Sequence, residues 1–238
     1  MNVEKLSKRL ELVANAVPKD ARVADIGSDH AYLPCYLALN EQITYAVAGE
    51  VVDGPFQSAC LHVKEQGLEE KVFVRLADGL DAIEELDKID TVTICGMGGD
   101  LISKILERGY IKGQLKTVNT LILQPNIGEQ HVRKWLMAHQ YKIIEEYIIE
   151  ENKKIYEVIV ATVSKDDIEY SLEQLQFGVF LPDRKETAFV QKWMLELDKY
   201  ESVIKQLKQA KTDESEKILL FREKQRVIKE MLGNAHSK

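Results

Sequence analysis

Acidic residues follow the first three β-branched runs of the chain, where a parallel sheet would bring them together at one edge. Asp25, Glu50 and Asp78 lie at or directly after the ends of these runs. A carboxylate there can accept hydrogen bonds from both hydroxyls of a ribose or from the amino group of an adenine. A single acid at such a position is more often a helix cap or a solvated turn. Three at successive strand ends favour a nucleoside site.

The loop after the first run favours a nucleoside without phosphates. Its sequence, Gly27-Ser28-Asp29-His30, begins with a glycine that lets the backbone approach a ligand closely. It lacks the GxGxxG pattern of dinucleotide-binding loops, and Asp29 adds a negative charge where a pyrophosphate needs backbone N–H groups. S-adenosylmethionine has a ribose, an adenine and a sulfonium cation but no phosphate, so we predict it as the cofactor. Asp25 could fix the loop or accept from an amino group, and His30 could contact a ligand or cap the next helix.

Glycines and amides mark the ends of the fourth and fifth runs. The segment Cys95-Gly96-Met97-Gly98-Gly99 has three glycines in four residues, although a tight turn would need only one. A substrate base or the methyl donor could therefore approach this backbone closely. Gln124-Pro125-Asn126 carries two amides that could hydrogen-bond the edge of a base, although turn chemistry alone could explain Asn126.

Strand-like and helix-like patterns alternate over the first 165 residues, which predicts an α/β fold. This alternation requires right-handed crossovers and a parallel sheet covered on both faces. Only 151–153 separate the last two strands, so these must form an antiparallel hairpin at the sheet edge. We predict a doubly wound, seven-stranded, Rossmann-like sheet. The strands are expected at 22–26, 43–49, 71–76, 91–95, 119–124, 141–150 and 154–163, and the helices at 3–17, 31–40, 54–66, 80–87, 99–108 and 128–139.

The remaining residues, 166–238, have the pattern of an α-helical coiled-coil hairpin. Eleven of the 13 glycines and four of the five prolines lie before residue 165, so few turns are expected after it. Apolar residues recur at helical spacing from Phe189 to Leu207 and again from Ile218 to Leu232. We therefore predict a boundary between a domain at 1–165 and a helical domain at 166–238.

Composition favours a protein of the cytoplasm that needs no metal. No apolar stretch approaches the ~18 residues that span a bilayer, and charges interrupt the N-terminal segment. Cys35, Cys60 and Cys95 form no CxxC pair and should be reduced thiols, and the histidines lack metal-ligand spacing. A net charge of −7 and a pI near 5.4 exclude a generally basic nucleic-acid binder. Binding of a nucleic acid would therefore require a local basic patch.

Several of these motifs together resemble one enzyme family. ADIGSDHAYLP, AGEVVDGPFQSA, ADGL, GMGG, LILQPN and IYEVIVA, with LSKRL near the start, are similar to the bacterial tRNA adenine-22 N1-methyltransferases, often called TrmK. The likeness is strongest over 6–163 and architectural beyond. It implies a class I methyltransferase fold, S-adenosylmethionine as the donor, and transfer to N1 of an adenine in tRNA.

This resemblance assigns roles to the residues at the strand ends. N1 of adenine has a lone pair even when neutral, so the enzyme must align the atoms and stabilise the positive charge that moves onto the ring. Asp29 and Asn126 are the catalytic candidates, and Asp29 could instead bind the methionine amino group. A paired target must be flipped out of its helix. The residues expected to bind the donor are Asp25, Gly27, Ser28, His30, Glu50, Val51, Asp78, Gly79, Gly96 and Met97, and those expected to contact the RNA are Lys5, Lys8, Arg9, Gly98, Gly99 and Gln124.

Contact with tRNA would also use positive charge outside the pocket. Lys5, Lys8 and Arg9 are expected to share one face of the first helix, opposite its apolar residues. The helical domain is the second candidate surface, although each of its cations taken singly is more often an ordinary solvated side chain. The candidates in the helical domain are Arg184, Lys185, Lys192 and Lys199, and Arg133 and Lys134 are further candidates in the first domain.

Two other functions remain open from the sequence. One is a methyltransferase-like domain that binds RNA or protein without catalysis, which the joint presence of Asp25, Glu50 and Asp78 disfavours. The other is a small-molecule methyltransferase whose helical tail serves dimerisation. We expect a monomer or a weak dimer.

Overall fold

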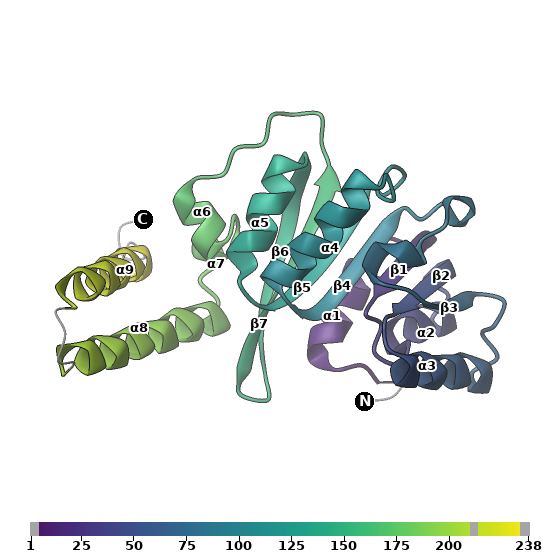
Figure 1. The fold of residues 1–238 in the computed structure, drawn as a ribbon, viewed down its shortest axis with the longest axis horizontal. Helices are drawn as coiled ribbons and strands as arrows, with labels where there is room; N and C mark the ends of the chain where they lie inside the picture. Colours follow the sequence, from purple (N-terminus) through teal and green to yellow (C-terminus); the bar gives the residue numbers. More distant parts are fainter. Residues whose placement is uncertain (1–4, 210–213, 234–238) are drawn as a thin grey trace. The chain divides into compact units, whose positions relative to one another are not determined.

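The chain folds into two compact units, one ending at Phe180 and the other beginning at Leu181. The computed structural model describes residues 5–209 and 214–233 (Figure 1). The first unit is an α/β domain and the second is helical, as the alternation of patterns and the glycine distribution predicted.

A seven-stranded sheet forms the centre of the first unit, with the strand order β3-β2-β1-β4-β5-β7-β6. Strands β1 to β5 are parallel, and β7 is antiparallel to both of its neighbours. The hairpin turns at Asn152 and Lys153, whose φ angles of 52° and 63° suit a tight two-residue connection. The strands are β1 (Ala21–Ile26), β2 (Ile43–Glu50), β3 (Val72–Leu76), β4 (Thr91–Gly98), β5 (Thr120–Ile127), β6 (Tyr141–Glu151) and β7 (Lys154–Val163).

Helices cover both faces of this sheet and bury one apolar cluster on each side. The first cluster joins α1, α2 and α3 to the strands, and the second joins α4 and α5 to the opposite face. This is the doubly wound architecture predicted from the sequence. The helices are α1 (Lys8–Ala16), α2 (Tyr32–Leu39), α3 (Asp53–Glu65), α4 (Gly99–Ile111), α5 (Glu129–Ala138) and α6 (Leu172–Phe177).

Two helices differ most from the predicted ranges, whereas the bounds of the others shift by one to three residues. The helix expected at 3–17 begins at Lys8, because Ser7 caps it by accepting from the backbone N–H of Leu10. The helix expected at 80–87 is instead two short 3₁₀ turns, η1 (Gly79–Ala82) and η2 (Glu85–Asp87).

The first unit extends beyond residue 165, where the sequence indicated a boundary. The segment after β7 packs back on the sheet, and the backbone N–H groups of Val179 and Phe180 donate to Glu146 at 2.6 and 2.9 Å. Glu146 also pairs with the fully buried Arg133 at 2.8 Å. This buried ionic network depends on chain beyond the polar run near 165, so the structural boundary lies after Phe180.

The second unit is an antiparallel pair of helices, α8 (Thr187–Lys208) and α9 (Ser215–Gly233), preceded by the short α7 (Leu181–Arg184). Tyr200 packs on Phe221 with ring centroids 5.4 Å apart, and Lys185 donates to the carbonyl of Met231 at 2.8 Å. The chain just before α8 thus contacts the end of α9, and the second half of α8 contacts the first half of α9, which gives the hairpin predicted from the apolar spacing.

Candidate functional site

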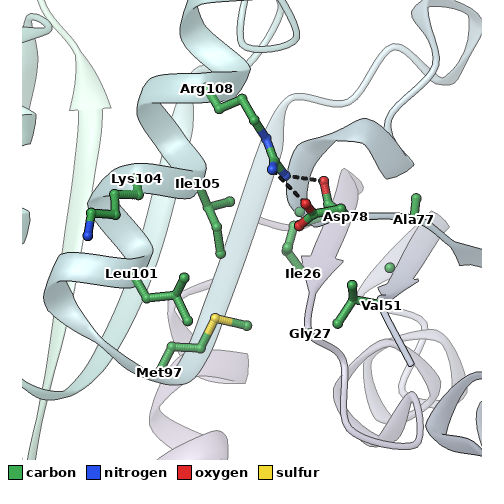
Figure 2. Close-up of a pocket in the computed structure, with 12 residues that line it drawn as sticks. Ile26, Gly27, Val51, Ala77, Asp78, Met97, Leu101, Lys104, Ile105 and Arg108 are labelled. Carbon is green, nitrogen blue, oxygen red and sulfur yellow. Dashed lines mark hydrogen bonds and ion pairs between the residues drawn. The ribbon is translucent and has the colours of Figure 1, made fainter.

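Two neighbouring cavities open at the carboxyl ends of β1, β2 and β4, where the strand order reverses. Open α/β sheets bind their ligands at this point. The cavities measure about 290 and 350 Å³, and both are bordered by Gly27 and Met97. The first is otherwise lined by Ile26, Gly49, Val51, Ala77, Asp78, Gly79, Leu101, Lys104, Ile105 and Arg108 (Figure 2). The second is lined by Arg9, Leu10, Asp25, Ser28, Asp29, Leu33, Cys95, Gly96, Asn126 and Tyr156.

Glu50 ends β2 between two residues that line the first cavity, and its carboxylate has an unused oxygen. The residue is only 6% exposed. Its Oε1 atom is buried and has no hydrogen-bond partner, while the backbone N–H of Asp29 donates to the carboxylate. Burial raises the pKa of Glu50, and the nearby Asp25 and Asp29 raise it further. A buried acceptor in this state costs free energy until a donor group reaches it.

Asp78 lines the first cavity directly after β3 and is fixed by Arg108 of α4. Arg108 Nη1 donates to Asp78 Oδ2 at 2.6 Å, and its Nη2 also bonds the Asp78 carbonyl (Figure 2). This hydrogen bond lowers the pKa of Asp78, which therefore stays ionised. The other oxygen, Oδ1, has no bond to Arg108 and can accept from a ligand. The sequence placed Arg108 in a helix but gave no signal that it would reach Asp78.

Asp25 fixes the loop after β1. The residue is 3% exposed, and its two oxygens accept from Ser28 Oγ and Thr93 Oγ1, each at 2.6 Å. Burial raises the pKa of this carboxyl, whereas the two hydroxyl hydrogen bonds lower it. Of the two roles that the sequence allowed, the geometry favours fixing the loop.

Gly27 is required at its position for two reasons. Its φ of 71° lies in the left-handed region, and a Cβ there would lie 2.2 Å from the Met97 methyl carbon. Met97 therefore packs directly on the backbone between the two cavities.

The residues after Ser28 adopt a strained backbone. Asp29, His30 and Ala31 have φ angles of 45°, 66° and 57°, which non-glycine residues seldom adopt in succession. The His30 carbonyl lies 3.0 Å from His62 Nδ1, and His62 packs edge-on against Tyr32. No side chain caps α2, so the capping role considered for His30 is absent. No role at this site was predicted for His62, because only the fold brings α3 beside the loop.

Asp29 is the most exposed acid of the loop. Its side chain is 75% exposed and lines the second cavity, 3.7 Å from His30 Nε2. A ligand can therefore reach the Asp29 carboxylate without displacing a short internal hydrogen bond.

The two amides at the end of β5 have different positions. Gln124 is fully buried, and its Oε1 accepts from Arg9 Nη1 at 2.6 Å and from the Gly96 N–H at 3.0 Å. It positions this wall and lines neither cavity, contrary to the predicted base contact. Asn126 is exposed and lines the second cavity, where its Nδ2 donates to the Gly96 carbonyl at 2.7 Å.

The two glycines after Met97, Gly98 and Gly99, differ in how closely they are packed. Gly99 is buried where α4 meets the chain before α5, and a Cβ on it would lie 2.1 Å from the carbonyl oxygen of Gly128. Helix packing therefore explains Gly99, and the predicted RNA contact is not needed for it. Gly98 precedes α4, and space is open around its Cα. Neither glycine lines the two cavities.

The expected basic face of the first helix does not form as predicted. Lys5 precedes the helix, and Lys8 is exposed at its first turn. Arg9 instead lines the second cavity, with its guanidinium 4.9 Å from the centroid of Tyr156 on β7. The apolar period of the helix could not reveal this, because Tyr156 is distant in sequence.

Other reactive groups add no second centre in the described ranges 5–209 and 214–233. Cys35, Cys60 and Cys95 are free thiols, and burial raises the pKa of Cys95, so it is held neutral beside the second cavity. Within those ranges no three His, Cys, Asp or Glu residues are grouped as a metal ion would require. No helix there is long and apolar enough to span a membrane.

Known proteins share the sequence and the fold that form this site. Residues 23–230 match the family model TrmK, tRNA (adenine(22)-N(1))-methyltransferase. A Bacillus subtilis (strain 168) protein of that name is 44% identical over 240 residues, covering 98% of this chain and 100% of that protein. A Streptococcus pneumoniae protein solved with S-adenosyl-L-methionine has a TM-score of 0.87 and 45% identity, over 96% of this chain and 100% of that one. TrmK of M. capricolum, solved with S-adenosyl-homocysteine, has a TM-score of 0.85 and 27% identity, over 96% and 98%.

Proposed function

The chain belongs to the TrmK family of tRNA (adenine(22)-N(1))-methyltransferases, and from this we propose how its own residues carry out the reaction. It is an S-adenosylmethionine-dependent enzyme that methylates N1 of adenine 22 in tRNA. The single observation in the chain that best supports donor binding is the unpartnered, buried Oε1 of Glu50 beside a nucleoside-sized cavity.

The first cavity fits the adenosine part of the donor. Glu50 would accept from the ribose hydroxyls, and Asp78, held by Arg108, would accept from the adenine amino group. Val51, Leu101 and Ile105 supply apolar walls for the base. Backbone atoms would lie close to the ligand at Gly27, Ser28, Gly79 and Gly96, as would the thioether of Met97. Asp25 and His30 would shape the loop after β1. S-adenosylmethionine supplies an electrophilic methyl group on its sulfonium sulfur.

The second cavity fits the methionine part of the donor together with the target base. N1 attacks through its own lone pair, so no residue must first remove a proton. Asp29 lines this cavity, and its exposed carboxylate would stabilise the positive charge that moves onto the adenine ring. Asn126 would hydrogen-bond the base edge from the end of β5. A paired adenine must leave its stack to reach this depth.

We propose that the helical second unit provides an additional contact with tRNA. Its candidate cations are Arg184, Lys185, Lys192 and Lys199. Lys185 and Lys199 already bond within the unit, to the Met231 carbonyl and to Glu196. Phosphate contacts dominate RNA affinity and would have to compete with these internal bonds. The main alternative is that this unit joins two copies, whereas the proposal expects a monomer or a weak dimer.

The function is tested by incubating the protein with labelled S-adenosylmethionine and bulk bacterial tRNA, followed by nucleoside mass spectrometry. The expected product is labelled 1-methyladenosine. Donor binding without any labelled nucleoside would favour a non-catalytic RNA-binding module. Label in a small molecule alone would favour the other methyltransferase class. A tRNA substrate and free thiols fit a cytoplasmic protein.

A further inference from the structure

Arg9 is the one cationic side chain among the described residues that line the second cavity. The sequence grouped it with surface lysines as an RNA contact, yet its side chain is partly buried against β5 and β7. Its position requires an explanation because a guanidinium remains charged at all physiological pH values.

The partners of Arg9 are neutral. Nη1 donates to the side-chain carbonyl of Gln124 at 2.6 Å, and the Tyr156 ring lies 4.9 Å from the guanidinium carbon. Nε is buried and has no hydrogen-bond partner. No carboxylate of the described residues forms an ion pair with Arg9. The guanidinium is thus held in a fixed orientation with donor capacity left unused, which is a costly arrangement unless an anion completes it.

Charge excludes the target base as that partner. Adenine is neutral before the transfer and carries a positive charge after N1 is methylated. A guanidinium facing the base would repel the charge that develops in the transition state, whereas catalysis requires the opposite sign there. The anion that Arg9 can pair with must therefore belong to the donor, whose only negative group is the carboxylate of its methionine part.

We propose that Arg9 anchors the α-carboxylate of S-adenosylmethionine, so that α1 closes the methionine end of the donor site. The inference rests on the proposed function of the two cavities. Arg9 lies in the same cavity as Gly27 and Ser28 of the loop and Gly96 of β4. Gln124 positions the guanidinium of Arg9. The donor carboxylate neutralises the guanidinium charge, so that this charge does not repel the sulfonium or the target base. A fork-shaped guanidinium suits a carboxylate better than a lysine would.

The test compares donors that differ only in the carboxylate. Isothermal titration measures the affinities of wild type, Arg9→Met and Arg9→Lys for S-adenosylmethionine and for decarboxylated S-adenosylmethionine. Arg9→Met should weaken S-adenosylmethionine binding by about tenfold to a hundredfold. It should change the affinity for the decarboxylated ligand by less than about twofold. Lys71→Met removes one exposed cation before β3, at the opposite edge of the sheet, and should leave both affinities unchanged.

Equal losses for both ligands would overturn the proposal, because Arg9 would then support the pocket in general. Unchanged donor affinity with weaker tRNA binding would also overturn it and return Arg9 to the RNA. If Arg9→Met does not fold, Arg9→Lys decides, since it should weaken binding only of the ligand that has the carboxylate. Wild-type protein that bound neither donor would instead contradict the proposed function, independently of Arg9.

Discussion

Replacing Glu50 by glutamine tests the donor site most directly, because the buried carboxylate costs free energy in the donor-free protein and contributes binding energy in the donor-bound protein. Without the donor, a buried carboxylate leaves Oε1 unpartnered near Asp25 and Asp29. With the donor, the same oxygen would accept at least one ribose hydroxyl. Glu50→Gln should therefore weaken donor binding while leaving the free protein at least as stable as wild type.

The size of the effect follows from the contacts. One hydrogen bond to a charged acceptor contributes about 1.5–3 kcal/mol, so its loss should weaken binding by about tenfold to a hundred-and-fifty-fold. Glutamine keeps one acceptor oxygen, so Glu50→Gln should lie near the lower end and Glu50→Ala near the upper. Isothermal titration with S-adenosylhomocysteine measures the affinities, and thermal unfolding of the free proteins measures the stabilities. Glu70→Gln, an exposed acid before β3, is the matched control.

The pH dependence gives a second readout. The pKa of Glu50 is raised in the folded protein, so folding takes up protons between its unfolded and folded pKa values. Its contribution to stability therefore falls as pH rises above the ordinary range of a glutamate. Donor affinity should rise over the same range, because ribose hydroxyls favour the ionised acceptor. Wild-type affinity in Glu50→Gln, or an affinity independent of pH, would refute the assignment.

Three other changes test the remaining parts of the molecule. Asp29→Asn should lower the rate of methyl transfer far more than it weakens tRNA binding, measured by single-turnover kinetics and by filter binding; comparable losses in both would make Asp29 structural. A chain of residues 1–180 should fold and bind donor but methylate tRNA poorly, and 1–165 should melt at a lower temperature; full activity of 1–180 would leave the helical unit to another role. Arg133→Met should lower the free energy of unfolding by about 3–5 kcal/mol in chemical denaturation, because Glu146 and Glu157 would lose the buried cation that pairs with both; a loss below about 1 kcal/mol would contradict this.

Periodicity predicted the sheet because each strand and helix is a local pattern. The hairpin of β6 and β7 followed from the short connection between them, since no crossover fits there. The acids at the strand ends reached the site for the same topological reason, because parallel strands end at one edge. Glu50 and Asp78 thus lie on or beside the first cavity as expected.

Contacts between distant segments could not be predicted in this way. Arg9 reaches Tyr156 only because α1 packs near the edge strands, and Arg108 reaches Asp78 only because α4 lies over η1. The division between the compact units lies beyond the predicted boundary near 165 for a similar reason, since the backbone N–H groups of Val179 and Phe180 donate to Glu146, whose burial cannot be inferred from the sequence. Local patterns carry no information on such partners.

The contact between Gly27 and Met97 has a consequence for how sequences of this fold can vary. A Cβ at position 27 would lie 2.2 Å from the Met97 methyl carbon, so the two positions share one small volume. An alanine at 27 therefore requires the end of the Met97 side chain to move, together with a backbone that accepts a left-handed conformation. A smaller side chain at 97 is compatible with Gly27, whereas a side chain at 27 is compatible only with a changed position or identity of the residue at 97. An engineer who wishes to enlarge both cavities where they share a wall should begin at position 97, because position 27 has no side chain to shorten.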